Sequence, residues 1–361
     1  MVRCNMLEFF ATIIGGGFAA LFDYLSAHVL TCLIPAFFIA GAINTMLPKE
    51  IITRNLGVKS SLFKAYPLSV AAGLLLAVCS CTILPLFAGI RKKGAGLGPA
   101  LTFLYTAPAT NILAIAFTGS VLGWDFAAAR IALSVTFAIA IGMIITYIFR
   151  KDDEKEAREK PKPACAPEKI SDGKTQSLSN IALFLLTLLG ILFVGTWQMP
   201  IEWRASGLAA LIIIVYIEQR AWFSREQVSG WMSETWVFAK TIIPLLIAGI
   251  FAAGVISAAL PDRFLESYLG QNTVQANLIA VLFGVFMYFP TLVEVPMAKT
   301  FLALGMAKGP LLAYMLADPV ISLPSILVIR KYIGDKKTAV YVGLIIIFCT
   351  LAGLIYGYFA G

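Results

Sequence analysis

Long apolar stretches separated by short polar ones make up most of the chain. Many approach or exceed the roughly 20 residues that a helix needs to cross a bilayer. The pattern predicts helices at 7–22, 25–47, 97–118, 122–149, 179–197, 204–218, 237–260, 308–329 and 338–359. Two further apolar stretches, 65–91 and 275–303, are interrupted by Pro and Gly. We therefore expect an all-α polytopic membrane protein with about nine to ten transmembrane helices.

Composition supports this class. Of 361 residues, 59% are hydrophobic and 13% are charged, and the mean hydropathy is +0.86. A soluble domain is about half apolar and one quarter charged. A soluble protein with buried helices is excluded because the apolar stretches outnumber what one core could cover. The lipid bilayer is the predicted partner and nucleic acid is not, since excess Lys and Arg in a membrane protein first reports topology.

One long polar segment divides the chain. Residues 150–178 mix both charge signs, include several prolines and are predicted to form a cytoplasmic charged linker. Residues 1–149 then form an N-terminal transmembrane repeat and residues 179–361 a C-terminal one. The first part of the linker, DDEKEAREK, can extend the preceding helix through Glu/Lys pairs one turn apart.

The two halves share an order of glycines and prolines. A shift of 213 places FFIAGAINTMLP over IFAAGVISAALP, and the same shift places Leu56 over Leu269. A shift of 211 aligns residues 79–111 with 290–322, and the matched hinge candidates are Pro85 with Pro296, Gly94 with Gly305, and Pro108 with Pro319. Chance explains shared Leu and Ala, but Gly and Pro fix backbone shape. We interpret the halves as a duplication.

Basic residues predict the orientation. The loops 48–64, 91–93 and 330–337 are rich in Lys and Arg and should be cytoplasmic. With a cytoplasmic N-terminus, the two repeats are inverted, and 65–91 and 275–303 are re-entrant hairpins. Inverted repeats with broken helices are typical of secondary transporters, whose site lies near the membrane midplane.

A pair of cysteines stands at one of the breaks. Cys79 and Cys81 flank Ser80 shortly before Pro85. Thiolates are soft ligands, and at a broken turn both sulfurs can face one soft atom. The alternative is that a free cysteine is simply a small buried residue. For the pair we favour substrate binding, whereas Cys349, alone in an apolar helix, fits the structural alternative.

The second repeat offers carboxylates instead. Glu294 and Asp318 lie in apolar surroundings, where a carboxylate is costly and indicates function, such as proton coupling. The alternative for Glu294 is a structural ion pair with Lys299. The alternative for Asp318 is a helix cap just before Pro319.

Further polar residues follow the prolines at the second pair of breaks. Thr110 and Asn111 follow Pro108, and Ser322 follows Pro319. They either line a substrate path or satisfy the kinked backbone. The chain has no P-loop motif, HExxH motif or Ser/His/Asp set, so we expect neither an enzyme nor a cofactor.

The stretch CSCTILPLFAGIRKKGAGLGPALTFLYTAPATN resembles the C-S-C-x-x-x-P-L-F-x-G signature, with its later Gly, Phe, Pro and Asn positions, of a predicted-permease family. That family includes ArsP-like organoarsenical efflux permeases. The resemblance covers both halves and implies a multi-pass inner-membrane permease that exports methylarsenite by alternating access. Cys79 and Cys81 would capture this thiophilic solute, and Glu294 or Asp318 would couple its export to protons.

Three other functions stay open from the sequence. A soft metal cation, Cu(I) or Zn(II), would bind Cys79 and Cys81 together with Glu294 or Asp318. A sulfur compound could be carried, an anion using half-helix N-termini and the basic cluster 91–93. A non-transporting scaffold is the third, and a homo-oligomer is compatible with all of them.

Overall fold

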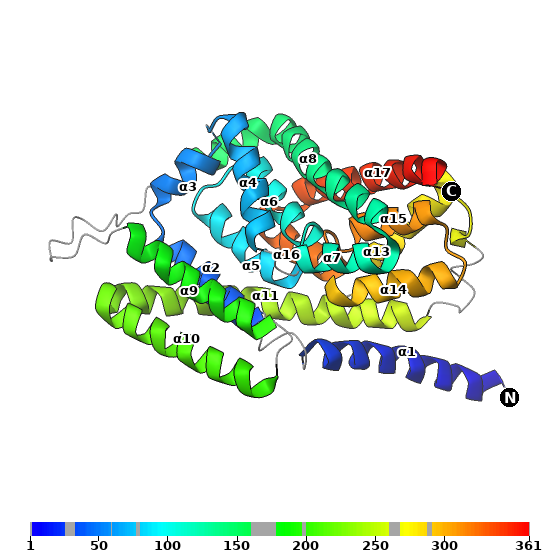
Figure 1. The fold of residues 1–361 in the computed structure, drawn as a ribbon, viewed down its shortest axis with the longest axis horizontal. Helices are drawn as coiled ribbons and strands as arrows, with labels where there is room; N and C mark the ends of the chain where they lie inside the picture. The colour runs from blue at the N-terminus through cyan, green and yellow to red at the C-terminus, as the bar shows by residue number, and fades with distance from the viewer. Residues whose placement is uncertain are drawn as a thin grey trace.

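The computed structural model describes residues 2–25, 33–58, 60–76, 80–159, 178–196, 200–259, 268–286 and 291–360. Within these ranges the regular elements are all helices, as predicted (Figure 1). The first half contains α1 (Val2–Tyr24), α2 (Ile34–Met46), α3 (Lys49–Leu56), α4 (Leu62–Leu76), α5 (Ser80–Lys92), α6 (Leu97–Ala109), α7 (Ile112–Leu122) and α8 (Trp124–Glu159). The second contains α9 (Leu178–Thr196), α10 (Ile201–Trp222), α11 (Arg225–Ala259), α13 (Val274–Phe286), α14 (Thr291–Ala303), α15 (Lys308–Ala317), α16 (Leu323–Ile333) and α17 (Asp335–Ala360).

The helices are long and apolar enough for a multi-pass membrane protein. In the described part of the chain four single helices could cross a bilayer, and the pair α6 and α7, bent by 48°, could form a fifth span. Five shorter apolar helices accompany them: Ala11–Phe22, Ile34–Met46, Leu62–Leu74, Ser179–Gly195 and Val274–Phe286. These spans agree with an all-α polytopic membrane protein, while the count of nine to ten transmembrane helices stays a prediction.

Some predicted boundaries were wrong. The expected single helices 97–118 and 308–329 are each two helices, broken after Ala109 and after Ala317. Pro319 has no N–H to continue the hydrogen bonds of α15, although Asp318 before it keeps helical backbone angles (φ −51°, ψ −50°). The predicted loop 48–64 contains the short helix α3. The expected extension into the linker is confirmed, because α8 continues to Glu159.

The internal repeat is visible in the backbone. A shift of 211 carries both ends of α5 onto those of α14, both ends of α7 onto those of α16, and the start of α8 onto that of α17. Gly94 (φ 98°) and Gly305 (φ 92°) both end their half-helices in a left-handed conformation. After each of them a backbone N–H bonds back to an earlier loop, Gly96 to Leu56 and Ala307 to Leu269. The duplication read from the sequence is therefore a duplication of structure.

The repeats are inverted. The ring centroids of Phe137 and Phe348, which are 211 residues apart, lie 5.2 Å from each other where the middles of α8 and α17 meet. Phe126, near the start of α8, stacks on Tyr356, near the end of α17. The matched helices α8 and α17 therefore run antiparallel (Figure 1), so a two-fold axis across the helices relates the repeats.

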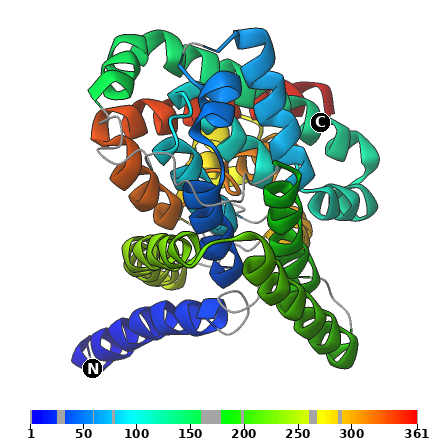
Figure 2. The ribbon, with the colours of Figure 1, turned by 90° about the vertical axis from the view of Figure 1, so that its left-hand side faces the viewer.

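The broken helices occupy the centre. All of α6 and nearly all of α15 are buried, and α6 packs on α8 as α15 packs on α17. Glycines permit both crossings, since a Cβ on Gly98 would lie 2.4 Å from the carbonyl oxygen of Gly142 and one on Gly309 would lie 2.6 Å from that of Gly353. Helices α1, α9 and α10 lie outside this core (Figure 2).

Candidate functional site

The cysteine motif is only partly within the described residues. Cys79 lies outside the described residues. Cys81 is the second residue of α5, and only its backbone is within the described part. Ser80 begins α5 and is buried, and Pro85 lies inside the same helix. The proposed thiol site thus begins at the N-terminal end of a half-helix, and its sulfur geometry stays a prediction.

The polar residues at the second pair of breaks are buried. Thr110 donates its hydroxyl to the carbonyl oxygen of Thr106 at 2.7 Å, so it satisfies the end of α6. Asn111 precedes α7, and its counterpart at the 211-residue shift, Ser322, precedes α16 and shares a 2.9 Å hydrogen bond with Ser325. These contacts favour the interpretation that Thr110 satisfies the kinked backbone. Asn111 and Ser322 are themselves buried and directly precede the half-helices α7 and α16.

A fully buried ion pair links the two repeats. Arg130 on α8 donates from Nη2 to both carboxylate oxygens of Glu294 on α14, at 2.8 and 3.1 Å. Its Nη1 donates to the hydroxyl of Thr118 on α7 at 3.1 Å. Both charged side chains have no exposed surface. The alternative pairing of Glu294 with Lys299 was wrong: Lys299 is exposed, and Arg130 is the partner.

Arg130 is the residue that the sequence interpretation missed. It lies within the apolar stretch 122–149, where a guanidinium is as costly as a carboxylate. The cost of burying this guanidinium could have identified Arg130 from the sequence. It could not have identified Glu294 as its partner. The contacts of Nη2 with both carboxylate oxygens and the bond of Nη1 to Thr118 offset part of the desolvation, and removing either charge would leave the other buried and unpaired.

Asp318 lies near this pair. It is the C-cap of α15, directly before Pro319, and is 4% exposed. The expectation that it starts a helix was wrong, because α16 begins after Ser322 and a carboxylate is disfavoured at a helix C-terminus. One turn earlier, Tyr314 is fully buried, and the charges of Asp318, Glu294 and Arg130 all act on it. The two carboxylates proposed for proton coupling therefore face one buried region.

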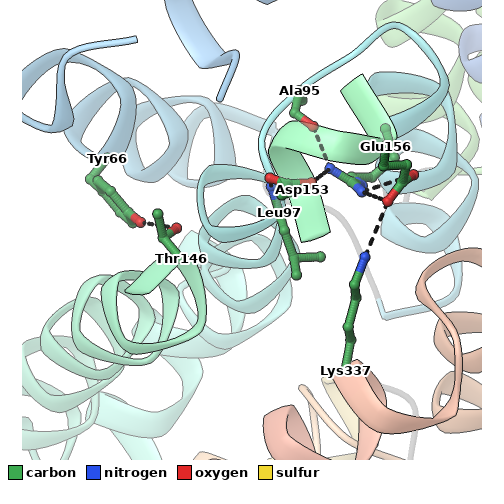
Figure 3. A network of polar contacts seen from close by, with 8 residues as sticks. Tyr66, Ala95, Leu97, Thr146, Asp153, Glu156 and Lys337 are labelled. Carbon is green, nitrogen blue, oxygen red and sulfur yellow. Dashed lines mark hydrogen bonds and ion pairs between the residues drawn. The ribbon is translucent and has the colours of Figure 1, made fainter. Parts of the chain in front are cut away.

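A second polar cluster lies where α5, α8 and α17 meet (Figure 3). Arg91 donates to Asp153 at 3.0 Å and to Glu156 at 3.2 Å. Asp153 also accepts the N–H of Leu97, the first residue of α6, at 2.7 Å. Lys337 on α17 donates to Glu156 at 3.1 Å and joins the second repeat to the first. We call these four charged residues the ionic latch.

The basic cluster 91–93 is thus not a bare anion site. Arg91 is held by the latch, and Lys92 pairs with Glu234 at 2.9 Å. Among the described residues no three His, Cys, Asp or Glu side chains gather as metal ligands. Cys349 is buried beside the hydroxyl of Tyr105, with 3.9 Å between the sulfur and the oxygen.

Inverted repeats, broken half-helices and a buried charge pair between the repeats are typical of a multi-pass membrane transporter. The comparison with known families agrees: residues 15–358 match the family described as a predicted permease. The chain belongs to this permease family.

Relatives extend over the same length. The chain is 38% identical to UPF0718 protein MJ0584 of Methanocaldococcus jannaschii, over 99% of both chains. It is 24% identical to UPF0718 protein YraQ of Escherichia coli, over 82% of this chain and 68% of that one. A Streptococcus mutans protein, 22% identical over 93% of this chain and 99% of its own, carries a name that proposes a subunit of a two-component membrane permease complex. No solved structure gives a significant match.

Proposed function

We propose that the protein is an inner-membrane secondary permease that exports a thiophilic solute, with methylarsenite as the leading substrate, in exchange for protons. The observation that carries the transport mechanism is the buried Arg130–Glu294 pair between inverted repeats. A buried charge pair is weak support for stability and, at membrane depth, indicates a functional element. The N-terminus is placed in the cytoplasm by the basic loops.

Cys79 and Cys81 are the proposed substrate ligands. Trivalent arsenic bonds to soft thiolates, and two thiols release a bound atom more readily than a closed four-ligand site does. Ser80 lies between them at the start of α5, which contacts α16 of the other repeat. A movement of one repeat against the other would therefore change which side of the membrane reaches the thiols.

Glu294 is the proposed proton-coupling carboxylate, and Arg130 is its counterion. When Glu294 takes a proton it loses its charge, so Arg130 becomes a buried cation without an anion. That state is strongly unfavourable in a low-dielectric interior. Protonation can thus drive the repeats into a different arrangement, which is what exchange of a solute for protons requires.

The other candidates receive less support from the same contacts. A metal cation would need a free carboxylate beside the thiols, yet both oxygens of Glu294 accept from Arg130. An anion would need unpaired basic residues at 91–93, yet Arg91 and Lys92 are in ion pairs. Oligomeric state, including a homo-oligomer or a second subunit like that named for the S. mutans relative, stays a prediction.

The test is accumulation of methylarsenite in everted membrane vesicles. The native chain is compared with the Cys79→Ser/Cys81→Ser double variant, with and without an imposed proton gradient. We expect accumulation that requires the gradient and that the double variant loses. Cys349→Ser is the matched control, because this buried thiol lies against Tyr105 on α6 and is expected to be structural.

Each contrary outcome would remove a different part of the proposal. Unchanged transport in the double variant would remove the cysteines from the site and leave Glu294 and Asp318. No accumulation by the native chain, in vesicles shown to contain folded protein, would contradict the arsenical substrate.

A further inference from the structure

Three polar residues distinguish the second repeat from the first in one place. Glu294, Tyr314 and Asp318 are all buried. Their counterparts at the 211-residue shift are Ile83, Phe103 and Ala107. The first repeat shows that this packing is compatible with apolar side chains, so packing does not require the polar ones.

Tyr314 is the least explained of the three. Its ring packs against Phe283 on α13 and Phe301 on α14, with centroids 5.9 and 5.6 Å away. Its hydroxyl is fully buried and has no hydrogen-bond partner among the described residues. A buried hydroxyl without a partner is unfavourable, so its presence needs a reason other than stability.

Tyr314 lies beside Asp318 and packs against the helix that carries Glu294. Asp318 follows it by four residues, on the same side of the chain, and Gly284 of α13 faces both: a Cβ there would lie 3.2 Å from the Tyr314 ring and 3.4 Å from Asp318 Cβ. Phe301, on which the ring packs, is seven residues beyond Glu294 and so shares its helix face.

The charged groups that act on the Tyr314 hydroxyl are Asp318 from its own segment, Glu294 from α14 and Arg130 from α8. By geometry, the hydroxyl belongs to a side chain one turn before Asp318 whose ring packs against α14, the helix that carries Glu294.

We propose that the Tyr314 hydroxyl relays protons between Asp318 and Glu294, which rests on the proton coupling proposed above. A protonated Asp318 gives a proton to the phenolic oxygen, and the phenolic proton passes to the Glu294 carboxylate. Water molecules bridge both transfers, because the hydroxyl has no hydrogen-bond partner among the described residues. Tyr314 ends neutral, Asp318 ends ionised and Glu294 ends as the acid. The O–H bond then rotates back for the next proton.

The relay moves charge as well as a proton. The negative charge leaves α14 and appears at the break between α15 and α16, while Arg130 stays positive on α8. Arg130 is then attracted away from Glu294 and toward Asp318, which links proton arrival to a displacement of α8 against α14.

The experiment follows protonation without any substrate. Purified protein in liposomes is given a rapid drop in pH, and the carboxylic-acid infrared band is recorded with time. Glu294→Gln and Asp318→Asn assign the two bands. In Tyr314→Phe we expect the Glu294 band to appear about 100-fold more slowly, the loss expected when a positioned proton-transfer group is removed.

Tyr105→Phe is the matched control. Tyr105 is equally buried, but its hydroxyl lies against the Cys349 sulfur. We expect this variant to protonate Glu294 at the native rate. Tyr314→Phe should fold, because the first repeat already carries Phe103 at this position, and a melting curve verifies it.

The outcomes separate the relay from the proposed function. An unchanged rate in Tyr314→Phe, or equal slowing in Tyr105→Phe, would overturn the relay and leave methylarsenite export standing. Absence of a Glu294 band in the native protein would overturn both the relay and coupling through Glu294. Slowed protonation in a native chain that does not accumulate methylarsenite would support the relay and remove only that substrate.

Discussion

At the scale of single residues, the unusual feature is a guanidinium and a carboxylate held together without solvent. Arg130 and Glu294 have no exposed side-chain surface, and Thr118 accepts a third hydrogen bond from the guanidinium. Such a pair stabilises the fold little relative to an apolar replacement, but half of it is worse than either alternative. Replacing the whole pair by apolar residues therefore tests for a functional role, because such a replacement should preserve the fold.

Arg130→Met is expected to destabilise the protein by about 3–5 kcal/mol, because it leaves Glu294 buried without a partner. Adding Glu294→Ile, the residue type found at Ile83 in the first repeat, should recover most of that loss. Thermal unfolding in detergent measures both. Gradient-driven transport should be absent from the double variant although it folds. A double variant that still exchanges solute for protons would show the pair to be structural.

At the scale of elements, paired glycines end the half-helices α5 and α14. Gly94 and Gly305 each occupy a backbone region that side chains rarely adopt. In both, the next residue's N–H reaches back to the helix, Ala95 to Ile90 at 3.0 Å and Met306 to Phe301 at 2.9 Å. This arrangement satisfies carbonyl groups at the C-terminal ends of α5 and α14 that the helices leave unpaired.

Gly305→Ala should cost about 1–2 kcal/mol, because an L side chain is strained at this φ. Gly343→Ala in the middle of α17 is the control, since an added Cβ there meets nothing within 4 Å. Its helical position predicts a gain of up to about 1 kcal/mol. Melting temperatures of the two purified variants should therefore move in opposite directions, and equal shifts would contradict the role of the turn.

At the scale of the whole molecule, the ionic latch joins the end of α8 to the start of α17 (Figure 3). Arg91, Asp153 and Glu156 belong to the first repeat, and Lys337 brings in the second. The inverted counterpart of Lys337 is Phe126, which stacks on Tyr356 instead. One end of the α8–α17 contact is therefore held by charges and the other by aromatic rings.

Lys337→Met should weaken the contact between repeats while leaving Arg91 bound to Asp153. Loss of about 1 kcal/mol from a partly exposed pair would shift an opening equilibrium about fivefold. The measurement is the maleimide labelling rate of Cys79 and Cys81, mapped by mass spectrometry, which should rise. Lys336→Met, an exposed neighbour, is the control. Unchanged labelling would mean that the latch does not restrain access to the thiols.

Much of the fold could be predicted from the sequence. The shifts of 211 and 213 placed the repeat correctly because Gly and Pro constrain the backbone locally, whatever lies around them. The extension of α8 followed from charged residues one turn apart. The predicted helices 97–118 and 308–329 ran through the breaks after Ala109 and Ala317, because the hydropathy of the sequence does not change there.

The candidate site was less accessible to sequence. Glu294 and Asp318 were identified because a carboxylate among apolar residues is costly wherever it lies. Their surroundings were not identified, because Arg130 is 164 residues from Glu294 along the chain and meets it only when α14 packs beside α7. Nothing in the sequence singles out Tyr314, because the burial of its hydroxyl without a hydrogen-bond partner among the described residues follows from tertiary packing. Backbone sterics and hydropathy depend on residues that are adjacent in the sequence. The partner of a buried charge depends instead on which helices the inverted repeats bring into contact.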